Sequence, residues 1–268
     1  MSITVDGAST QSRCTRPGKK ISIAWCSGTR EYTSEMRSIL SWPLGQYGPL
    51  LGYPSMYNPY TADLVEKLSV MSKKGILSLG SYAPDIEEIL ALKLANRYRP
   101  YMTSESIGFR AFQNGTDATQ AAVALARFAT GRKHIVSIGY HGGSSPVFSF
   151  SPQDGGVVAE NGGYRTDVDF EAYPAWRQTW DGQWWKGQWD RIAAIIVEIP
   201  SVEDEELAQD ILVQIEHDCR AHGAKLIMDE IVTGFRYSSA GALGYYENIS
   251  ADFVCLGKAM STYGKVSA

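Results

Sequence analysis

The chain has 268 residues, of which 44% are hydrophobic and 20% are charged, so it can bury one substantial core. Its formal net charge of −4 gives no electrostatic basis for binding nucleic acid or an anionic membrane. No apolar run approaches the roughly 20 residues that span a bilayer, the four cysteines show no metal-ligand spacing, and no secretory signal is recognisable, which predicts a cytoplasmic protein with reduced thiols and no metal site.

The N-terminal part of the chain predicts little regular structure. Residues 1–45 are rich in Ser, Thr, Gly and basic side chains with weak periodicity, and we expect them to form a partly ordered arm. Helical patterns follow at 62–68 and at 84–95, and a loop with small polar side chains at 77–82 leads into the second of them.

The junction at 109–117 is a candidate anion site. A short apolar element runs into Asn114, Gly115 and Thr116, and an alanine-rich helix begins there. The first N–H groups of a helix have no intrahelical partners and lie at the positive end of the helix dipole, so a glycine and a hydroxyl there suit a phosphate. The same residues also serve as plain helix caps, and the bare pattern leaves both interpretations open.

The next predicted strand runs through Ile138 and ends beside Tyr140 and His141. We interpret His141 as a structural residue or one that supports a site residue, because a lone histidine beside glycines is more often packed than catalytic. The irregular segment 150–191 then carries a cluster of tryptophans, Trp176, Trp180, Trp184, Trp185 and Trp189. They could form an aromatic platform for a sugar or a partner, but we favour a surface insertion whose rings pack on the core or on a second subunit.

Three apolar runs end in polar side chains. The run 191–197 precedes Glu198, the run 226–228 precedes Asp229, and the run 253–256 precedes Lys258. Buried parallel strands have this pattern, and open α/β sheets bind their ligands at the carboxyl ends of such strands. We therefore expect Asp229 and Lys258 to meet at one edge of the sheet.

Taken in order, these motifs resemble the class III pyridoxal-phosphate aminotransferases, and within them the branch of glutamate-1-semialdehyde 2,1-aminomutase and related aminotransferases. The similar motifs are Asn114–Thr116, Thr130–Arg132 followed by Tyr140–Gly142, Asp229–Arg236 and Leu256–Met260. The resemblance implies an α/β fold for residues 46–268, namely the aspartate-aminotransferase-like large domain with a mixed, mostly parallel sheet flanked by helices.

The resemblance implies pyridoxal 5′-phosphate as the cofactor and gives roles to four residues that would hold it. Lys258 would form a Schiff base with the cofactor and later move the substrate proton, and Asp229 would keep the pyridine nitrogen protonated. Gly115 and Thr116 would bind the phosphate. The implied activity is transfer of an amino group, by a transaminase or an aminomutase.

Five further residues receive roles from the same resemblance. Tyr140 and Ile231 would pack on opposite faces of the cofactor ring, since a flat phenol can cover a pyridinium face. Ser81, Tyr82 and Glu198 are candidates for the substrate pocket. In some relatives the glutamate also gates an arginine from the C-terminal domain.

The partners implied by the resemblance are a small amino donor, a keto or aldehyde acceptor and a second copy of the chain, because the family's pocket lies at a subunit interface. Val232 stands where ornithine- and GABA-type members usually carry glutamine, which favours the aminomutase-like branch. Neither the donor nor the acceptor follows from the residues.

Two departures from the family pattern leave alternatives open. Lys265 replaces a proline that usually follows the lysine, and the chain stops at Ala268, where a full member continues into a C-terminal small domain. The chain could therefore be a shortened, non-catalytic protein that binds the cofactor. A different pyridoxal-phosphate reaction such as racemisation is the other alternative, because the same lysine and aspartate serve several reactions.

Overall fold

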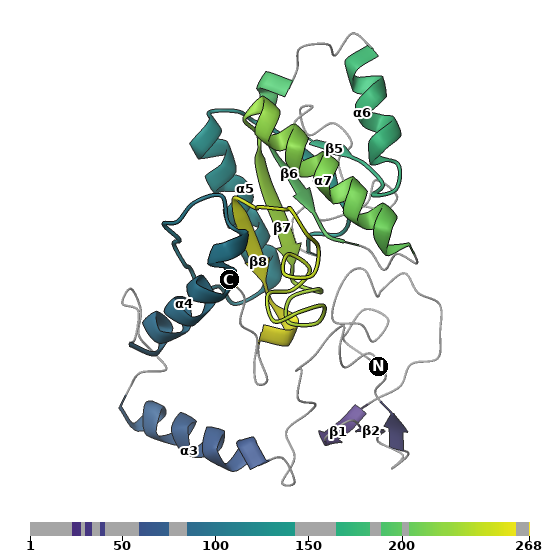
Figure 1. Ribbon diagram of the computed structural model, residues 1–268. Helices are drawn as coiled ribbons and strands as arrows, with labels where there is room; N and C mark the ends of the chain where they lie inside the picture. The colour runs from purple at the N-terminus through teal and green to yellow at the C-terminus, as the bar shows by residue number, and fades with distance from the viewer. Residues whose placement is uncertain are drawn as a thin grey trace, which may run out of the picture.

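The computed structural model describes residues 23–27, 30–33, 38–40, 59–74, 85–142, 165–182, 189–199, 204–260 and 268. Its centre is a five-stranded sheet in the order β5-β4-β6-β7-β8, and each neighbouring pair is parallel (Figure 1). In chain order the strands are β4 His134–Ile138, β5 Arg165–Asp167, β6 Ile192–Val197, β7 Lys225–Glu230 and β8 Phe253–Leu256. The α/β fold class predicted from the sequence is confirmed.

Helices supply the connections that parallel strands require. They are α3 Pro59–Lys73, α4 Asp85–Tyr98, α5 Gly115–Thr130, α6 Tyr173–Gly182 and α7 Glu205–His222, with short 3-10 turns at Arg99–Tyr101, Trp189–Arg191 and Lys258–Met260. Helix α7 begins where the Asp204 side chain accepts a hydrogen bond from the N–H of Leu207, 3.0 Å away, and ends at Gly223 in the left-handed conformation. Acidic residues in its first turn match the positive end of its dipole.

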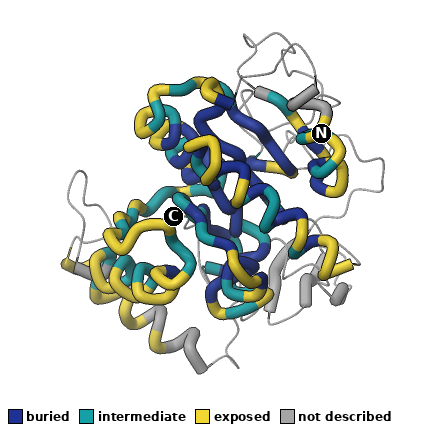
Figure 2. The backbone as a smooth tube through the Cα atoms, turned by 45° about the horizontal axis from the view of Figure 1, so that its top comes forward, coloured by how far each residue is buried: buried dark blue, intermediate teal, exposed yellow. Residues whose placement is uncertain are grey.

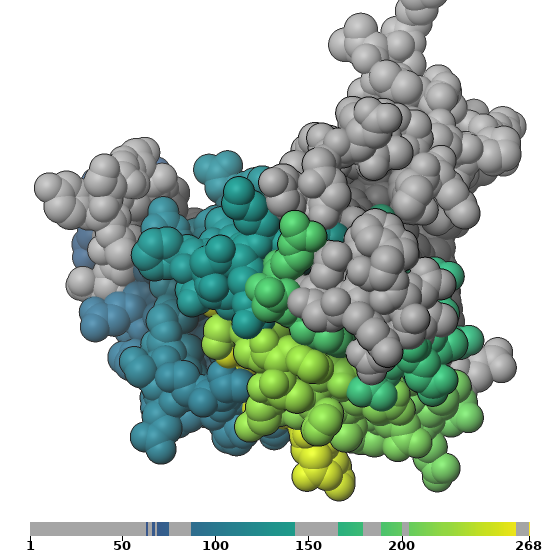
Figure 3. Space-filling view, turned by 90° about the horizontal axis from the view of Figure 1, so that it is seen from above, coloured from purple at the N-terminus to yellow at the C-terminus, as the bar shows by residue number. Residues whose placement is uncertain are grey.

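Two hydrophobic clusters cover the two faces of the sheet. Every residue of β6 is buried, as expected for a central parallel strand. Small side chains of α5, including Ala118, Ala122 and Ala126, pack on one face, whereas the larger side chains of α7 pack on the other. Figure 2 shows the buried residues gathered at the centre of the molecule, and in Figure 3 the teal residues around α5 and the lime-green residues around α7 form neighbouring bands of the surface.

The N-terminal part contains regular structure that the sequence did not predict. Strands β1 Ile23–Ser27, β2 Arg30–Thr33 and β3 Ser38–Leu40 form an antiparallel sheet, which Figure 1 shows apart from the central one. Such short strands leave little periodicity to detect, because each strand contributes only a few residues. The proposed boundary at residue 45 stays a prediction.

Two of the tryptophans in the predicted cluster pack within the domain. Trp189 is buried and stacks on His222 with ring centroids 4.4 Å apart, and Trp176 packs beside the buried Tyr173 at 5.6 Å. Trp184 and Trp185 lie outside the described residues, as does the side chain of Trp180. Among the described residues, no helix is long and apolar enough to cross a membrane.

Candidate functional site

The candidate site lies at the carboxyl ends of the parallel strands. Because β4, β6, β7 and β8 run in one direction, the residues that follow or end them, Tyr140, Glu198, Asp229 and Lys258, reach the same edge of the sheet. Helix α5 runs back along the sheet and brings its N-terminus to that edge. The Thr119 hydroxyl on its first turns lies 2.9 Å from the carbonyl oxygen of His141.

Asp229 is buried at this edge and is held by two donors. Its Oδ2 lies 2.7 Å from Nδ1 of His141, and its Oδ1 accepts a hydrogen bond from the N–H of Ile231 at 3.1 Å. Both side chains of the His141–Asp229 pair are almost completely excluded from solvent. Nε2 of His141 is also buried, and it has no hydrogen-bond partner within the described part of the chain. The histidine therefore orients the carboxylate, which agrees with the supporting role expected for it.

Glu198 links Asp229 electrostatically to Lys258. One oxygen of the Glu198 carboxylate accepts a hydrogen bond from the N–H of Tyr140 at 3.0 Å. Burial, reinforced by the negative charge of Asp229, raises the pKa of Glu198 from 4.5 to about 7, although the Tyr140 N–H, His141 and Lys258 act in the opposite direction. Asp229, His141 and Lys258 thus all influence the charge of Glu198, while the meeting of Asp229 with Lys258 stays a prediction.

Lys258 occupies an unusual backbone conformation directly after β8. Its φ of 41° lies in the left-handed region, which a residue with a Cβ adopts at a cost of about 1–3 kcal/mol. It begins the 3-10 turn Lys258–Met260, and its side chain is partly buried. In the pairing of β7 with β8, Asp229 lies opposite Cys255. Lys258 is three residues after Cys255 in the chain.

The N-terminus of α5 has the features of an anion site and a tight packing constraint. Asn114 caps the helix by accepting the N–H of Asp117 at 3.0 Å, and Thr116 is buried. A Cβ at Gly115 would lie 2.5 Å from Cδ1 of Ile231, and one at Gly142, whose φ is 112°, would collide with Oγ1 of Thr116. Gly115 thus lies close against the Ile231 side chain, which would have to shift to admit a Cβ there, while the role of Gly115 in phosphate binding stays a prediction.

The structure brings most of the predicted site residues together. Gly115, Thr116, Glu198, Asp229, Ile231 and Lys258 converge with Tyr140, whose side chain is 39% exposed. Ser81 and Tyr82, the candidates for the substrate pocket, lie outside the described residues. Within the ranges described above, no group of three or more His, Cys, Asp or Glu side chains is arranged to hold a metal ion.

Glu230, for which the sequence pattern predicted no role, organises the loop that follows β7. Its fully buried carboxylate accepts the N–H groups of Ala242 at 3.0 Å and Leu243 at 2.8 Å and a hydrogen bond from the Thr233 hydroxyl. Burial raises its pKa. Gly241 was the available signal, since its φ is 65° and a Cβ there would collide with this carboxylate.

Known proteins share both the sequence pattern and the fold. The family model described as aminotransferase class III matches residues 73–264. Glutamate-1-semialdehyde 2,1-aminomutase of Anaeromyxobacter sp. (strain K) is 34% identical over 190 residues, which cover 66% of this chain and 42% of that protein. The corresponding protein of Anaeromyxobacter dehalogenans (strain 2CP-C) is 33% identical with the same coverage. The chain thus spans less than half the length of these curated relatives.

Solved structures show the same fold at lower identity. A β-phenylalanine aminotransferase from Variovorax paradoxus superposes with a TM-score of 0.71 at 21% identity, covering 94% of this chain and 54% of the other. A glutamate-1-semialdehyde aminomutase from Pseudomonas aeruginosa PAO1 gives 0.68 at 20% identity, covering 92% and 52%. At this level of identity the superpositions establish the architecture alone.

Proposed function

The chain belongs to the class III aminotransferase family, and on this premise we propose that its site binds pyridoxal 5′-phosphate and transfers an amino group from a small donor to a keto or aldehyde acceptor. One observation carries the proposal. The buried His141–Asp229 pair, 2.7 Å apart, shares its surroundings with Lys258 and Glu198 at the carboxyl edge of the sheet.

The donor set fits this cofactor at each of its functional groups. The N-terminus of α5, with Gly115 and Thr116, would hold the phosphate through N–H groups and a hydroxyl. The Asp229 carboxylate would face the ring nitrogen, and Lys258 would bond covalently to the aldehyde carbon. Tyr140 and Ile231 would cover the two faces of the ring. Support comes from the placement of these residues around one edge and from the family match.

Asp229 and His141 act as a unit in this proposal. The imidazole donates from Nδ1 to the carboxylate and prevents it from turning, while the Ile231 N–H holds the other oxygen. A carboxylate held in this orientation can accept a hydrogen bond from a protonated nitrogen atom that faces it. When bound, the cofactor supplies an electron sink for the charge that develops as a substrate loses its proton.

Lys258 has two tasks in this proposal. Its uncharged amine would hold the cofactor at the aldehyde carbon, and the same nitrogen would carry a proton from the carbon atom of a bound substrate. Glu198, with a pKa of about 7, can accept or release a proton near neutral pH beside it. We place Glu198 at the substrate side because the backbone of Tyr140 donates to its carboxylate.

The first experiment is site-specific trapping. Purified chain is mixed with pyridoxal phosphate, reduced with borohydride, digested and analysed by peptide mass spectrometry, in parallel with Lys258→Ala. As a matched control, Lys93→Ala removes an exposed lysine of α4. We expect the reduced adduct at Lys258 in the wild type and in the Lys93 variant. An adduct spread over surface lysines, with none at Lys258, would refute the covalent assignment.

A second measurement separates amino transfer from simple cofactor binding. An amino donor added to the loaded protein should convert the cofactor to its amine form, which absorption spectroscopy follows. An adduct at Lys258 without this conversion would support a non-catalytic, cofactor-binding protein instead. Loss of stereochemistry in an amino acid without amino transfer would support a racemase.

Several finer expectations from the sequence stay predictions. They are a homodimer, a cytoplasmic location, an aminomutase-like rather than an ornithine-type substrate preference, and a cofactor domain that spans residues 46–268. Light scattering coupled to size-exclusion chromatography tests the first of these directly, since a dimer doubles the 29.5 kDa mass of the chain.

A further inference from the structure

Three tyrosines of the segment between β7 and β8 form a cluster against the start of α7. The rings of this tyrosine cluster, Tyr237, Tyr245 and Tyr246, have centroids 5.5, 6.3 and 5.2 Å apart. Tyr237 and Tyr245 are 38% and 44% exposed, whereas Tyr246 is buried. The Tyr245 hydroxyl donates a hydrogen bond to Oε2 of Glu205 at 2.6 Å. The cluster thus presents two aromatic rings beside a carboxylate at the surface.

A second contact with α7 holds the tyrosine cluster in place. The Gln209 side chain donates to the carbonyl of Glu247 at 2.6 Å and accepts a hydrogen bond from the N–H of Glu247 at 2.8 Å. Gln209 is one helical turn beyond Glu205, so the helix fixes the backbone directly after Tyr246. A surface that is already ordered in this way loses little conformational entropy when it binds a ligand.

Tyr246 leaves a hydrogen-bonding group unused within the cluster. Its hydroxyl is buried and has no hydrogen-bond partner in the part of the chain that the structure describes. Burial raises the pKa of Tyr246 to about 12, and Tyr237, Glu205 and Tyr245 all act in the same direction. A hydroxyl among groups that carry or can acquire negative charge suits a hydrogen bond from a cation.

Helix α7 takes part in a more complete arrangement near its other end. The Tyr173 hydroxyl donates to Oδ2 of Asp218 at 2.8 Å, and Nε of Arg177 donates to the same oxygen at 2.6 Å. At the start of the helix, Tyr245 occupies the corresponding place beside Glu205, but no basic side chain among the described residues pairs with that carboxylate. The second tyrosine–carboxylate pair therefore lacks the arginine that the first one has.

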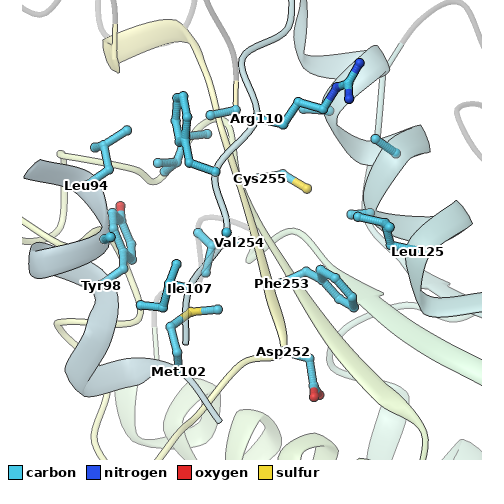
Figure 4. Close-up of a pocket in the computed structure, with 18 of the residues that line it drawn as sticks. Leu94, Tyr98, Met102, Ile107, Arg110, Leu125, Asp252, Phe253, Val254 and Cys255 are labelled. Carbon is cyan, nitrogen blue, oxygen red and sulfur yellow. The ribbon is translucent and has the colours of Figure 1, made fainter. Parts of the chain in front are cut away.

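Tyr98 is a further buried tyrosine whose hydroxyl has no partner in the described ranges. It lines an apolar cavity of about 430 Å³ between α4, α5 and β8, shown in Figure 4. Burial and Glu230 raise the pKa of Tyr98, and the positive charge of Arg97 acts in the opposite direction. The chain thus supplies an arginine near Tyr98, as it does near Tyr173, whereas every influence on the pKa of Tyr246 raises it.

We propose that the tyrosine cluster and Glu205 form a binding site for a guanidinium group carried on an alkyl chain. This group is planar, so its face can stack on an exposed tyrosine ring while its N–H groups donate to Glu205 and to the Tyr246 hydroxyl. It would complete the arrangement that Arg177 completes at Asp218. An alkylammonium ion has no flat face and is more strongly hydrated, so it binds less tightly.

Two sources carry such a group, an arginine side chain of another polypeptide and a small free guanidine. The acidic residues in the first turn of α7, Glu205 and Glu206, attract either of them. The site consists of the segment after β7 and the start of α7, and no residue assigned to the cofactor belongs to it. Binding is therefore measurable without pyridoxal phosphate, whatever the outcome for amino transfer.

Titration with small probes tests the site. N-acetyl-arginine amide is added to the purified chain carrying isotope-labelled tyrosine, and NMR follows the ring signals. N-acetyl-lysine amide keeps the charge without the flat group, and N-acetyl-citrulline amide keeps the shape without the charge. We expect the arginine probe to bind about fivefold more tightly than the lysine probe, because it adds stacking, and the citrulline probe to give no saturable shift.

A blocked peptide with one arginine between glycines distinguishes the two sources. Tighter binding of this peptide than of N-acetyl-arginine amide identifies an arginine of a polypeptide as the ligand, because the flanking backbone then adds contacts. Equal or weaker binding of the peptide identifies a small guanidine.

Matched variants make the outcome decisive. Glu205→Gln and Tyr246→Phe should each weaken binding of the arginine probe by about threefold or more, whereas their controls Glu206→Gln and Tyr98→Phe should not. Thermal unfolding checks that each variant is folded. Any of three results overturns the proposal: a citrulline probe that binds like the arginine probe, equal losses in Glu205→Gln and Glu206→Gln, or wild-type affinity in Tyr246→Phe.

Discussion

Asp229 and Glu230 are consecutive buried carboxylates at the end of β7, and the structure uses them in opposite ways. Because successive strand residues point to opposite faces, the two groups enter different surroundings. Asp229 is held by one imidazole and one N–H beside Lys258 and Glu198, whereas Glu230 accepts two backbone N–H groups and a hydroxyl. The chemical nature of the side chain is almost the same, so the partners decide whether a carboxylate serves chemistry or architecture.

The largest expected effect is the loss of stability in Glu230→Ala. The N–H groups of Ala242 and Leu243 would lose their acceptor while buried, at about 1–3 kcal/mol each. We therefore expect the free energy of unfolding, measured by urea denaturation, to fall by about 2–6 kcal/mol. Glu230→Gln keeps one acceptor oxygen and should lose less. A fall below about 1 kcal/mol in the alanine variant would contradict the architectural role.

Asp229→Asn should have the opposite effect, with little change in stability and a large loss of activity. The amide oxygen can still accept from Nδ1 of His141, so we expect the fold to tolerate the change. Amino transfer should slow by about ten- to a hundredfold, because a hydrogen bond to a charged group contributes about 1.5–3 kcal/mol. Absorption spectroscopy of the half-reaction measures the rate. An Asp229 variant as active as the wild type would remove the distinction between the two carboxylates.

Glu198 should make the free energy of unfolding depend on pH. In the folded protein its pKa is raised from 4.5 to about 7. Between these two pH values the folded protein therefore keeps a proton that the unfolded chain has already released. This contribution to stability is complete below about pH 4.5 and decreases as pH rises to about 7. Relative to Glu198→Gln, the wild type should lose about 1–2 kcal/mol across that range, after allowance for partial exposure.

Parallel urea titrations of the two proteins at several pH values measure this difference. The groups that face Glu198 are Asp229, His141 and Lys258, together with the N–H of Tyr140. A difference between wild type and variant that stays constant from pH 4.5 to 7 would show that Glu198 is not perturbed by its neighbours.

The smallest expected effect concerns the contact between α5 and the site. The Thr119 hydroxyl lies 2.9 Å from the carbonyl of His141 and 3.0 Å from that of Thr116. Thr119→Val should reduce the free energy of unfolding by about 1 kcal/mol and weaken binding of pyridoxal phosphate slightly. Thr130→Val removes a comparable hydroxyl at the far end of α5, where it donates to Ala126 at 2.8 Å. Equal cofactor affinity in both variants would argue against a role of Thr119 in the site.

The sequence predicted those parts of the site whose residues belong to short contiguous motifs. An apolar run that ends in Asp229, or in Glu198, identifies a buried strand and the side chain at its end. Gly115 and Thr116 identify the start of α5. The roles of these residues stay predictions, and the structure adds that Gly115 lies against Ile231 and that His141 contacts Asp229.

The sequence by itself predicted β4, β6, β7 and β8, the start of α5 and the chemistry of the residues at these strand ends, because periodicity and capping act over a few neighbouring residues. Only the tertiary structure decided which partners those residues meet. His141 and Asp229 are 88 positions apart, and Glu230 binds N–H groups 12 and 13 residues further along. Such contacts depend on strand order and loop path, which no local pattern encodes, and they separate the carboxylate of the candidate site from its structural neighbour.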